Sequence, residues 1–75
     1  MWQGRLLASA EVQFRETLAL APDFAEAANN LGLVHATRGE YGKAIEAYRK
    51  ALAIREDFAT VHMNMGLALE AQQRV

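Results

Sequence analysis

Apolar or ring-bearing side chains recur every three or four positions in four separate stretches of the chain. The first and third stretches share one phase and contain Leu7, Ala10, Phe14 and Leu18, and then Tyr41, Ala44, Ile45, Tyr48, Ala51 and Leu52. The second and fourth share another phase and contain Ala28, Leu31, Val34 and His35, and then Val61, His62, Met65 and Leu69. This spacing is typical of α-helices with one buried face. It predicts four helices, at about residues 3–20, 24–37, 41–54 and 58–72.

Short breaker sequences separate the four stretches. Pro22 cannot continue the first helix, and Asp23 with Glu26 three positions later reads as a capping box that opens the second. Asp57 takes the same capping position before the fourth helix. Gly39 follows the second helix, where glycine is the usual residue. Because connections this short make neighbouring helices antiparallel, we expect an all-α fold.

Part of the chain repeats itself after 34 residues. The segment 18–25 returns in modified form as 52–59. Three further residues keep their identity at this offset, so that Asn30, Gly32 and Leu33 return as Asn64, Gly66 and Leu67. A fixed period of this length is the signature of a repeat architecture, in which one unit cannot bury its apolar face alone. The repeats are therefore expected to stack on one another.

These residues resemble the tetratricopeptide repeat, a helix–turn–helix unit of about 34 residues. Counted from Ala25, the positions that fit the family pattern are Leu31, Gly32, Ala44, Tyr48 and Ala51, and the flanking segments add Phe14 and Gly66. The positions that depart from it are Ala28, His35 and Glu56. The resemblance implies a single domain over residues 1–75, an α-solenoid fragment of four antiparallel helices. It assigns 1–22 to the second half of a repeat, 25–58 to a complete repeat and 59–75 to the first half of another.

Small residues at the fitting positions have a physical reason. We expect Gly32, Ala44 and Ala51 to lie where helices approach closely, since a larger side chain would overpack the crossing. Tyr48 and Phe14 would fill the space that the small residues leave. Glycine inside a helix costs about 1 kcal/mol relative to alanine, and we expect close approach to compensate at Gly32 and at Gly66 alike.

The resemblance also implies a concave groove, because the sixth position of a repeat's first helix faces it. Asn30 and Asn64 hold that position, where such asparagines can bind the backbone of an extended peptide. The residues predicted to line or border the groove are Glu26, Asn29, Asn30, Leu33, Thr60, Met63, Asn64, Leu67 and Glu70. An alternative remains open, in which each asparagine bonds within the scaffold. The function implied is a non-catalytic protein–protein interaction module, without the lysine-lined carboxylate clamp that some members use.

Charge and composition remove other classes of function. The formal net charge is −1 with both signs interspersed, which favours neither a nucleic-acid partner nor a membrane surface. There is no cysteine, so the compartment is left open and we expect the cytoplasm. We interpret His35 and His62 as packing residues and expect no metal, cofactor or enzymatic activity. The pairs predicted at i,i+4 spacing are Glu11 with Arg15 and Glu46 with Lys50.

Two apolar faces predict self-association. The last helix carries Phe58, Val61, Met63, Met65, Leu67 and Leu69, and the first carries Trp2, Leu6, Leu7, Val12 and Phe14. Within the repeat pattern these helices are the two halves of one unit. Docking them between chains would bury apolar area worth about 25 cal/mol per Å², so a homo-oligomer through the first and last helices is expected. The alternative to a peptide-binding module is thus a self-assembling solenoid piece, or a fragment of a larger regulator or enzyme with such repeats.

Overall fold

The chain folds into four α-helices joined by short turns. A computed structural model describes the backbone of residues 2–74 and the side chains of residues 5–74. The helices are α1 (Trp2–Leu20), α2 (Ala25–Thr37), α3 (Tyr41–Ile54) and α4 (Ala59–Gln73), and the described residues contain no strand. Each helix begins and ends within one residue of the bounds predicted from the apolar pattern. The all-α prediction is therefore confirmed.

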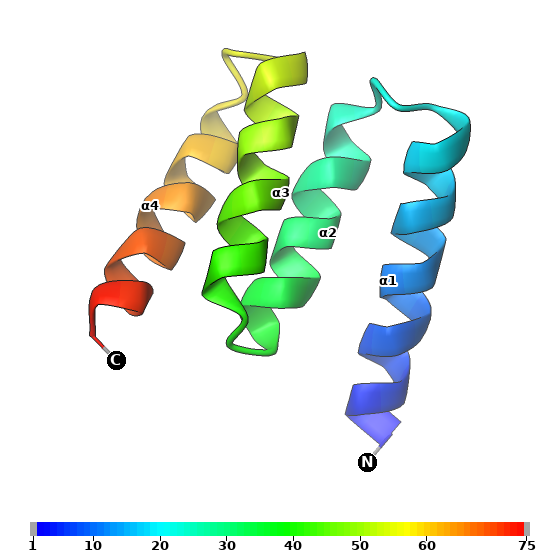
Figure 1. The fold of residues 1–75 in the computed structure, drawn as a ribbon, viewed down its shortest axis with the longest axis horizontal. Coiled ribbons are helices and arrows are strands. Elements are labelled where there is room, and N and C mark those ends of the chain that lie inside the picture. Colours follow the sequence, from blue (N-terminus) through cyan, green and yellow to red (C-terminus); the bar gives the residue numbers. More distant parts are fainter. Residues whose placement is uncertain (1, 75) are drawn as a thin grey trace.

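The helices lie side by side in chain order and alternate in direction (Figure 1). Contacts join α1 to α2, α2 to α3 and α3 to α4, with a smaller contact between α2 and α4, whereas α1 and α4 do not meet. The molecule is a flat layer with extents of 32 × 29 × 15 Å. In consequence α2 and α3 have neighbours on both sides, while α1 and α4 form the two edges.

The core is centred on α2 and α3 and is built largely from alanine. Its buried residues are Leu18, Ala27, Ala28, Ala44, Ile45, Tyr48, Ala51, Val61 and Ala68. The largest of them, Tyr48, is only 1% exposed, and this burial raises the pKa of its phenol. Small side chains let the helices approach closely, and a single large ring fills the space between them. Removing that ring would leave the largest cavity available in this core.

The predicted side-chain caps are wrong. The residues that flank α2 and α4 at their N-termini are Phe24 and Phe58, and neither helix has a side-chain cap hydrogen bond. The two aspartates, Asp23 and Asp57, each lie one residue too early, so the capping box between Asp23 and Glu26 does not form. Both phenylalanines are extended or nearly so. Phe58 packs against the core, and the guanidinium carbon of Arg55 lies 4.0 Å from the centre of its ring, a cation–π distance.

The glycine turn after α2 is confirmed. Gly39 has a φ of 79°, a left-handed conformation that glycine adopts without a steric penalty. Its amide donates to the carbonyl of Ala36, and the amide of Glu40 donates to the carbonyl of His35 at 2.8 Å. These bonds satisfy carbonyls at the end of α2. They also return the chain directly into α3.

Candidate functional site

Helices α2 and α3 pack tightly where Gly32 of α2 meets Tyr48 of α3. A Cβ atom placed on Gly32 would lie 2.4 Å from Cε1 and 2.6 Å from Cδ1 of the tyrosine ring. Ala44 and Ala51 beside it are fully buried. The contact at Gly32 agrees with the prediction that this position is small because the helices cross closely, and the burial of Ala44 and Ala51 is consistent with the same prediction. Tyr48 fills the space as expected.

Gly66 occupies the same repeat position in α4, but its surroundings differ. No atom of the described residues lies within 4 Å of a Cβ placed there, and the residue is exposed. The expectation that close approach compensates for this glycine is therefore wrong within the described chain. The physical reason is that α4 has α3 on one side and no helix on the other. Of the remaining repeat positions, Leu31 packs against the core and Phe14 is half-buried.

Two clefts lie on either side of Leu33. The first, of about 270 Å³, is lined by Leu33, Ala36, Tyr41, Tyr48, Asn64, Leu67, Ala68 and Ala71. The second, of about 230 Å³, is lined by Leu7, Phe14, Asn30, Leu33, Val34 and Thr37. Each of the six residues of the second cleft lies 34 positions before a residue of the first. The clefts are therefore repeats of one another, and neither is lined by a charged side chain.

The first cleft has a wall that the second lacks. Leu33 and Ala36 come to it from α2, the first helix of the preceding helix pair, in addition to the six repeated positions. The second cleft is formed by α1 and α2 alone. Within the described chain, α1 contacts α2 and no other helix, so no third helix adds a wall to this cleft. This difference follows from the edge position of α1.

The two asparagines at the repeated position are held differently. The Nδ2 atom of Asn64 donates to Oδ1 of Asn29 at 3.1 Å, and Asn29 is buried, at 7% exposed. This bond links α4 to α2. Asn30 is half-buried in the second cleft, and its side chain makes no hydrogen bond among the described residues. The alternative in which the asparagine bonds within the scaffold therefore holds for Asn64. The side-chain amide of Asn30 can still donate to and accept from a ligand.

The structure brings only part of the predicted groove together. Four predicted residues line the clefts, namely Asn30, Leu33, Asn64 and Leu67. Four others are exposed but line neither cleft, namely Glu26, Thr60, Met63 and Glu70. Sequence reasoning did not assign Tyr41 or Leu7 to this face. The signal was available, because Tyr41 and Tyr48 lie two helical turns apart and Leu7 and Phe14 repeat that spacing.

The two histidines are placed differently. His35 is buried as predicted, at 3% exposed, and its Nδ1 lies 2.8 Å from Oε1 of Glu40. This hydrogen bond lowers the pKa of the Glu40 carboxyl, so the ring donates to an ionised carboxylate. His62 is exposed, which contradicts the packing prediction, because its face of α4 has no neighbouring helix. Its Nε2 lies 2.9 Å from the Glu56 carbonyl. Among the described side chains, no three metal-ligating groups come together.

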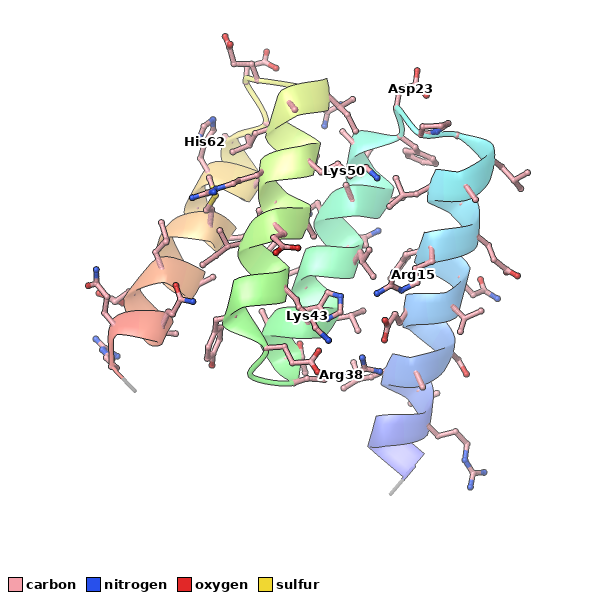
Figure 2. The ribbon with its side chains drawn as sticks, viewed as in Figure 1. Arg15, Asp23, Arg38, Lys43, Lys50 and His62 are labelled. Carbon is pink, nitrogen blue, oxygen red and sulfur yellow. The ribbon has the colours of Figure 1, made fainter. Side chains whose placement is uncertain are left out.

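Charged side chains gather on the side of the layer shown in Figure 2, where Arg15 of α1 and Lys43 and Lys50 of α3 are labelled. These three line a cleft of about 330 Å³ together with Leu31, His35, Glu46 and Ala47. The predicted pair between Glu46 and Lys50 does not form, since the described residues show no ion pair between them. Both side chains are exposed and extend into solvent.

One ion-pair cluster joins α1 to the end of α2. The predicted pair between Glu11 and Arg15 forms at 2.9 Å, and the other carboxylate oxygen of Glu11 accepts a hydrogen bond from Arg38. The bond from Arg38, followed by that from Arg15, lowers the pKa of Glu11 to about 2. Glu11 is therefore ionised at neutral pH. It fixes the edge helix at the point where the α2–α3 turn begins.

Comparison with known proteins agrees with this architecture. A family model described as a TPR repeat matches residues 35–73, which is just over half of the chain. The matched region runs from the end of α2 through α3 and α4. A search of curated proteins finds no similar sequence. In residues 2–74, none of the helices has both the length and the apolar character required to span a membrane.

Proposed function

The chain belongs to the tetratricopeptide repeat family, whose members are in general non-catalytic modules that bind other proteins. We propose that it binds a peptide along the face of the helix layer that carries Leu33 and the two clefts. The observation that supports this proposal is the pair of repeated, uncharged clefts on either side of Leu33. We assign residues 25–58 to a complete repeat, 1–22 to the second half of a repeat and 59–75 to the first half of another.

The chemistry of the clefts indicates the kind of peptide. The Asn30 amide makes no hydrogen bond among the described residues and lies beside an apolar wall, so it can donate to and accept from one peptide unit of an extended ligand. Leu33 and Leu67 are 40% and 58% exposed and offer apolar contact. In an extended peptide alternate side chains point the same way, which suits two clefts separated by one ridge. We therefore propose an extended ligand with apolar side chains and little charge, and a cytoplasmic setting without nucleic acid.

The groove is tested by comparing two alanine variants against one selected peptide. Peptides are chosen from a random library by binding to the 75-residue chain, and affinity is measured by calorimetry. Asn30→Ala removes hydrogen bonds worth about 0.5–1.5 kcal/mol, which predicts a loss of roughly 2- to 10-fold in affinity. Thr60→Ala is the matched control, because Thr60 is exposed and lines neither cleft. Equal affinities for Asn30→Ala and wild type would overturn the assignment.

A second candidate function is self-association through the edge helices. Exposed apolar side chains on α4 support it, since Met63, Leu67 and Leu69 are 61%, 58% and 41% exposed, as do Leu6 and Val12 on α1 at 57% and 55%. Covering such side chains removes apolar area from water. We expect sedimentation equilibrium at micromolar concentrations to give a mass above that of one chain. A single species of 8.3 kDa at all concentrations would refute this candidate.

A further inference from the structure

The contact between α2 and α3 provides a template for a contact that the chain does not make with itself. At an offset of 34 residues, α4 corresponds to α2 and α1 corresponds to α3. Gly66 then corresponds to Gly32, and Phe14 corresponds to Tyr48. In the template the tyrosine ring lies against the glycine. The equivalent phenylalanine and glycine stand on opposite edges of the layer, on helices that do not meet.

The outer face of α4 has the shape that such a contact requires. A Cβ at Gly66 would meet nothing within 4 Å, so the helix presents a flat surface there. Met65 is half-buried, and Leu69 is 41% exposed. These residues correspond to Leu31, which packs against the core that contains Tyr48, and to the buried His35. A glycine inside a helix costs about 1 kcal/mol, and a ring placed over Gly66 would account for that cost.

Helix α1 carries the residues that correspond to the α3 side of the template. Ala10 and Thr17 correspond to Ala44 and Ala51 of the template, and both are half-buried. The Thr17 hydroxyl already donates to the Gln13 carbonyl at 2.9 Å, so covering it leaves no unsatisfied donor. Gln13 is larger than its counterpart Ala47, which lines the cleft of about 330 Å³ that also contains Lys43 and Lys50. The side chains of Ala10 and Thr17 are thus small, and Phe14 between them is the one large ring.

The incomplete cleft gives an independent reason to expect a helix at this place. In the complete cleft, Leu33 and Ala36 of the preceding first helix form the wall that the α1–α2 cleft lacks. Their counterparts at the 34-residue offset are Leu67 and Glu70 of α4. A helix α4 docked on α1 would therefore add the missing wall to the cleft that contains Asn30. Glu70 would make its margin acidic where the first cleft has an alanine.

We propose that a second copy of this chain docks its α4 against α1, so that Phe14 packs over Gly66 of the second copy and Leu67 of that copy completes the α1–α2 cleft. This inference rests on the proposed self-association and specifies its register. The contact is heterologous, because two different surfaces meet, and each pair leaves one α1 and one α4 free to continue. Assembly then extends the row of repeated clefts from one chain to the next.

Two variants that each block one face provide the test. Gly66→Leu blocks α4, at a position where a Cβ atom meets nothing within 4 Å in the isolated chain. Ala10→Arg blocks α1 at a half-buried position, and Gln13→Arg serves as a second block at an exposed one. Thr60→Leu is the control, since it adds the same side chain to α4 at an exposed position about 120° around the helix from Gly66. Circular dichroism checks that each variant is folded, and sedimentation measures the mass.

Three results are expected together. Wild type and Thr60→Leu associate, and each blocked variant alone is weakened by about tenfold or more, equivalent to about 1.4 kcal/mol. An equal mixture of Gly66→Leu and Ala10→Arg forms a species of two chains and nothing larger, because one intact α1 meets one intact α4. A monomeric wild type would refute self-association itself. Association of wild type with no loss in Gly66→Leu, or a mixture that stays monomeric, would overturn the register alone.

Discussion

Gly32 and Gly66 hold the same position in successive repeats, yet one is enclosed and the other is open. At Gly32 a tyrosine ring occupies the place where a side chain would lie, whereas no atom of the described residues comes within 4 Å of a Cβ at Gly66. Both glycines carry the same conformational cost within a helix. The residue type at a repeat position is thus suited to the contact between stacked helices. Whether that contact is made depends on which neighbouring helices are present.

The same lesson holds one turn further along each helix. His35 in α2 is 3% exposed, whereas Leu69, its counterpart in α4, is 41% exposed. Hydrophobicity alone would order these residues the other way. The neighbouring helix decides the burial, because α2 lies between α1 and α3 and α4 lies at an edge. The centre of the layer is therefore where substitutions should cost the most.

The largest effect on stability is expected from Tyr48, whose ring encloses Gly32 and has no equivalent beside Gly66 among the described residues. Tyr48→Ala removes a residue that is 1% exposed, and truncating a buried aromatic residue costs about 3–5 kcal/mol. A domain this small has little more stability than that, so the variant should be unfolded at room temperature by circular dichroism. Tyr41→Ala, at the half-buried first turn of α3, should still melt cooperatively. A cooperative melt of Tyr48→Ala near wild type would contradict the central role of this ring.

The glycines themselves should respond with opposite signs. Gly32→Ala forces a methyl group against the Tyr48 ring at 2.4–2.6 Å, and such overpacking costs about 1–3 kcal/mol. Gly66→Ala meets no obstacle and gains helix propensity, which should stabilise the monomer by up to about 1 kcal/mol. Urea denaturation of dilute protein measures both changes. If the two variants change stability in the same direction, the enclosed and open environments are not the cause.

The two asparagines extend the comparison to the attachment of the edge helix. Asn64→Ala leaves Oδ1 of the buried Asn29 without its partner at 3.1 Å, so we expect a loss of about 1–2 kcal/mol. Asn30→Ala removes no hydrogen bond of the described scaffold and should be neutral or slightly stabilising, by up to about 0.7 kcal/mol. The same urea experiment measures both. Equal destabilisation by the two substitutions would show that Asn30 also holds the fold together.

The fold was predictable because its strongest constraints are local. The helices follow from apolar spacing, and the crossing of Gly32 with Tyr48 was expected from the resemblance to the tetratricopeptide repeat. The hydrogen bond between Asn29 and Asn64 joins residues 35 positions apart, and neither its partner nor its geometry is encoded in periodicity. The exposure of His62 depends on a missing neighbour rather than on its own sequence. Of the residues that line the two clefts, Asn30, Leu33, Asn64 and Leu67 were thus predicted, whereas Leu7 and Tyr41 were missed.

The cap and ion-pair errors have a different cause. Asp23 and Asp57 have the right residue type one position from the observed caps, and a shift of one residue is enough to lose a cap hydrogen bond. Glu40 lies beyond the glycine turn, so its bond to His35 falls outside the i+3 and i+4 spacings that helix patterns reveal. The unformed pair of Glu46 and Lys50 shows the converse, since suitable spacing on a solvent face does not fix two long side chains.

The smallest expected effect concerns the ion pairs that hold the other edge helix. Glu11 bonds Arg15 and Arg38, and these hydrogen bonds lower its pKa from 4.5 to about 2. A carboxyl whose pKa is depressed by folding stabilises the native state above the unfolded pKa and loses that contribution as the pH falls toward the folded value. Since the side chains of Glu11 and Arg38 are 21% and 26% exposed, solvent screens the pairs and we expect about 1 kcal/mol or less.

The comparison of wild type with Glu11→Gln isolates this contribution, because Glu40, whose pKa is also lowered, titrates in both proteins. Wild type should be the more stable of the two near neutral pH. The difference in the free energy of unfolding between the two proteins should shrink as the pH falls from about 4.5 to about 2. Protonation then removes the charge of Glu11, and glutamine carries no charge at any pH. Parallel stability curves over that range, measured by urea denaturation, would mean that Arg38 and Glu11 do not fix α1 to α2. The edge helix would then be held by its apolar contacts with α2, those of the buried Leu18 among them.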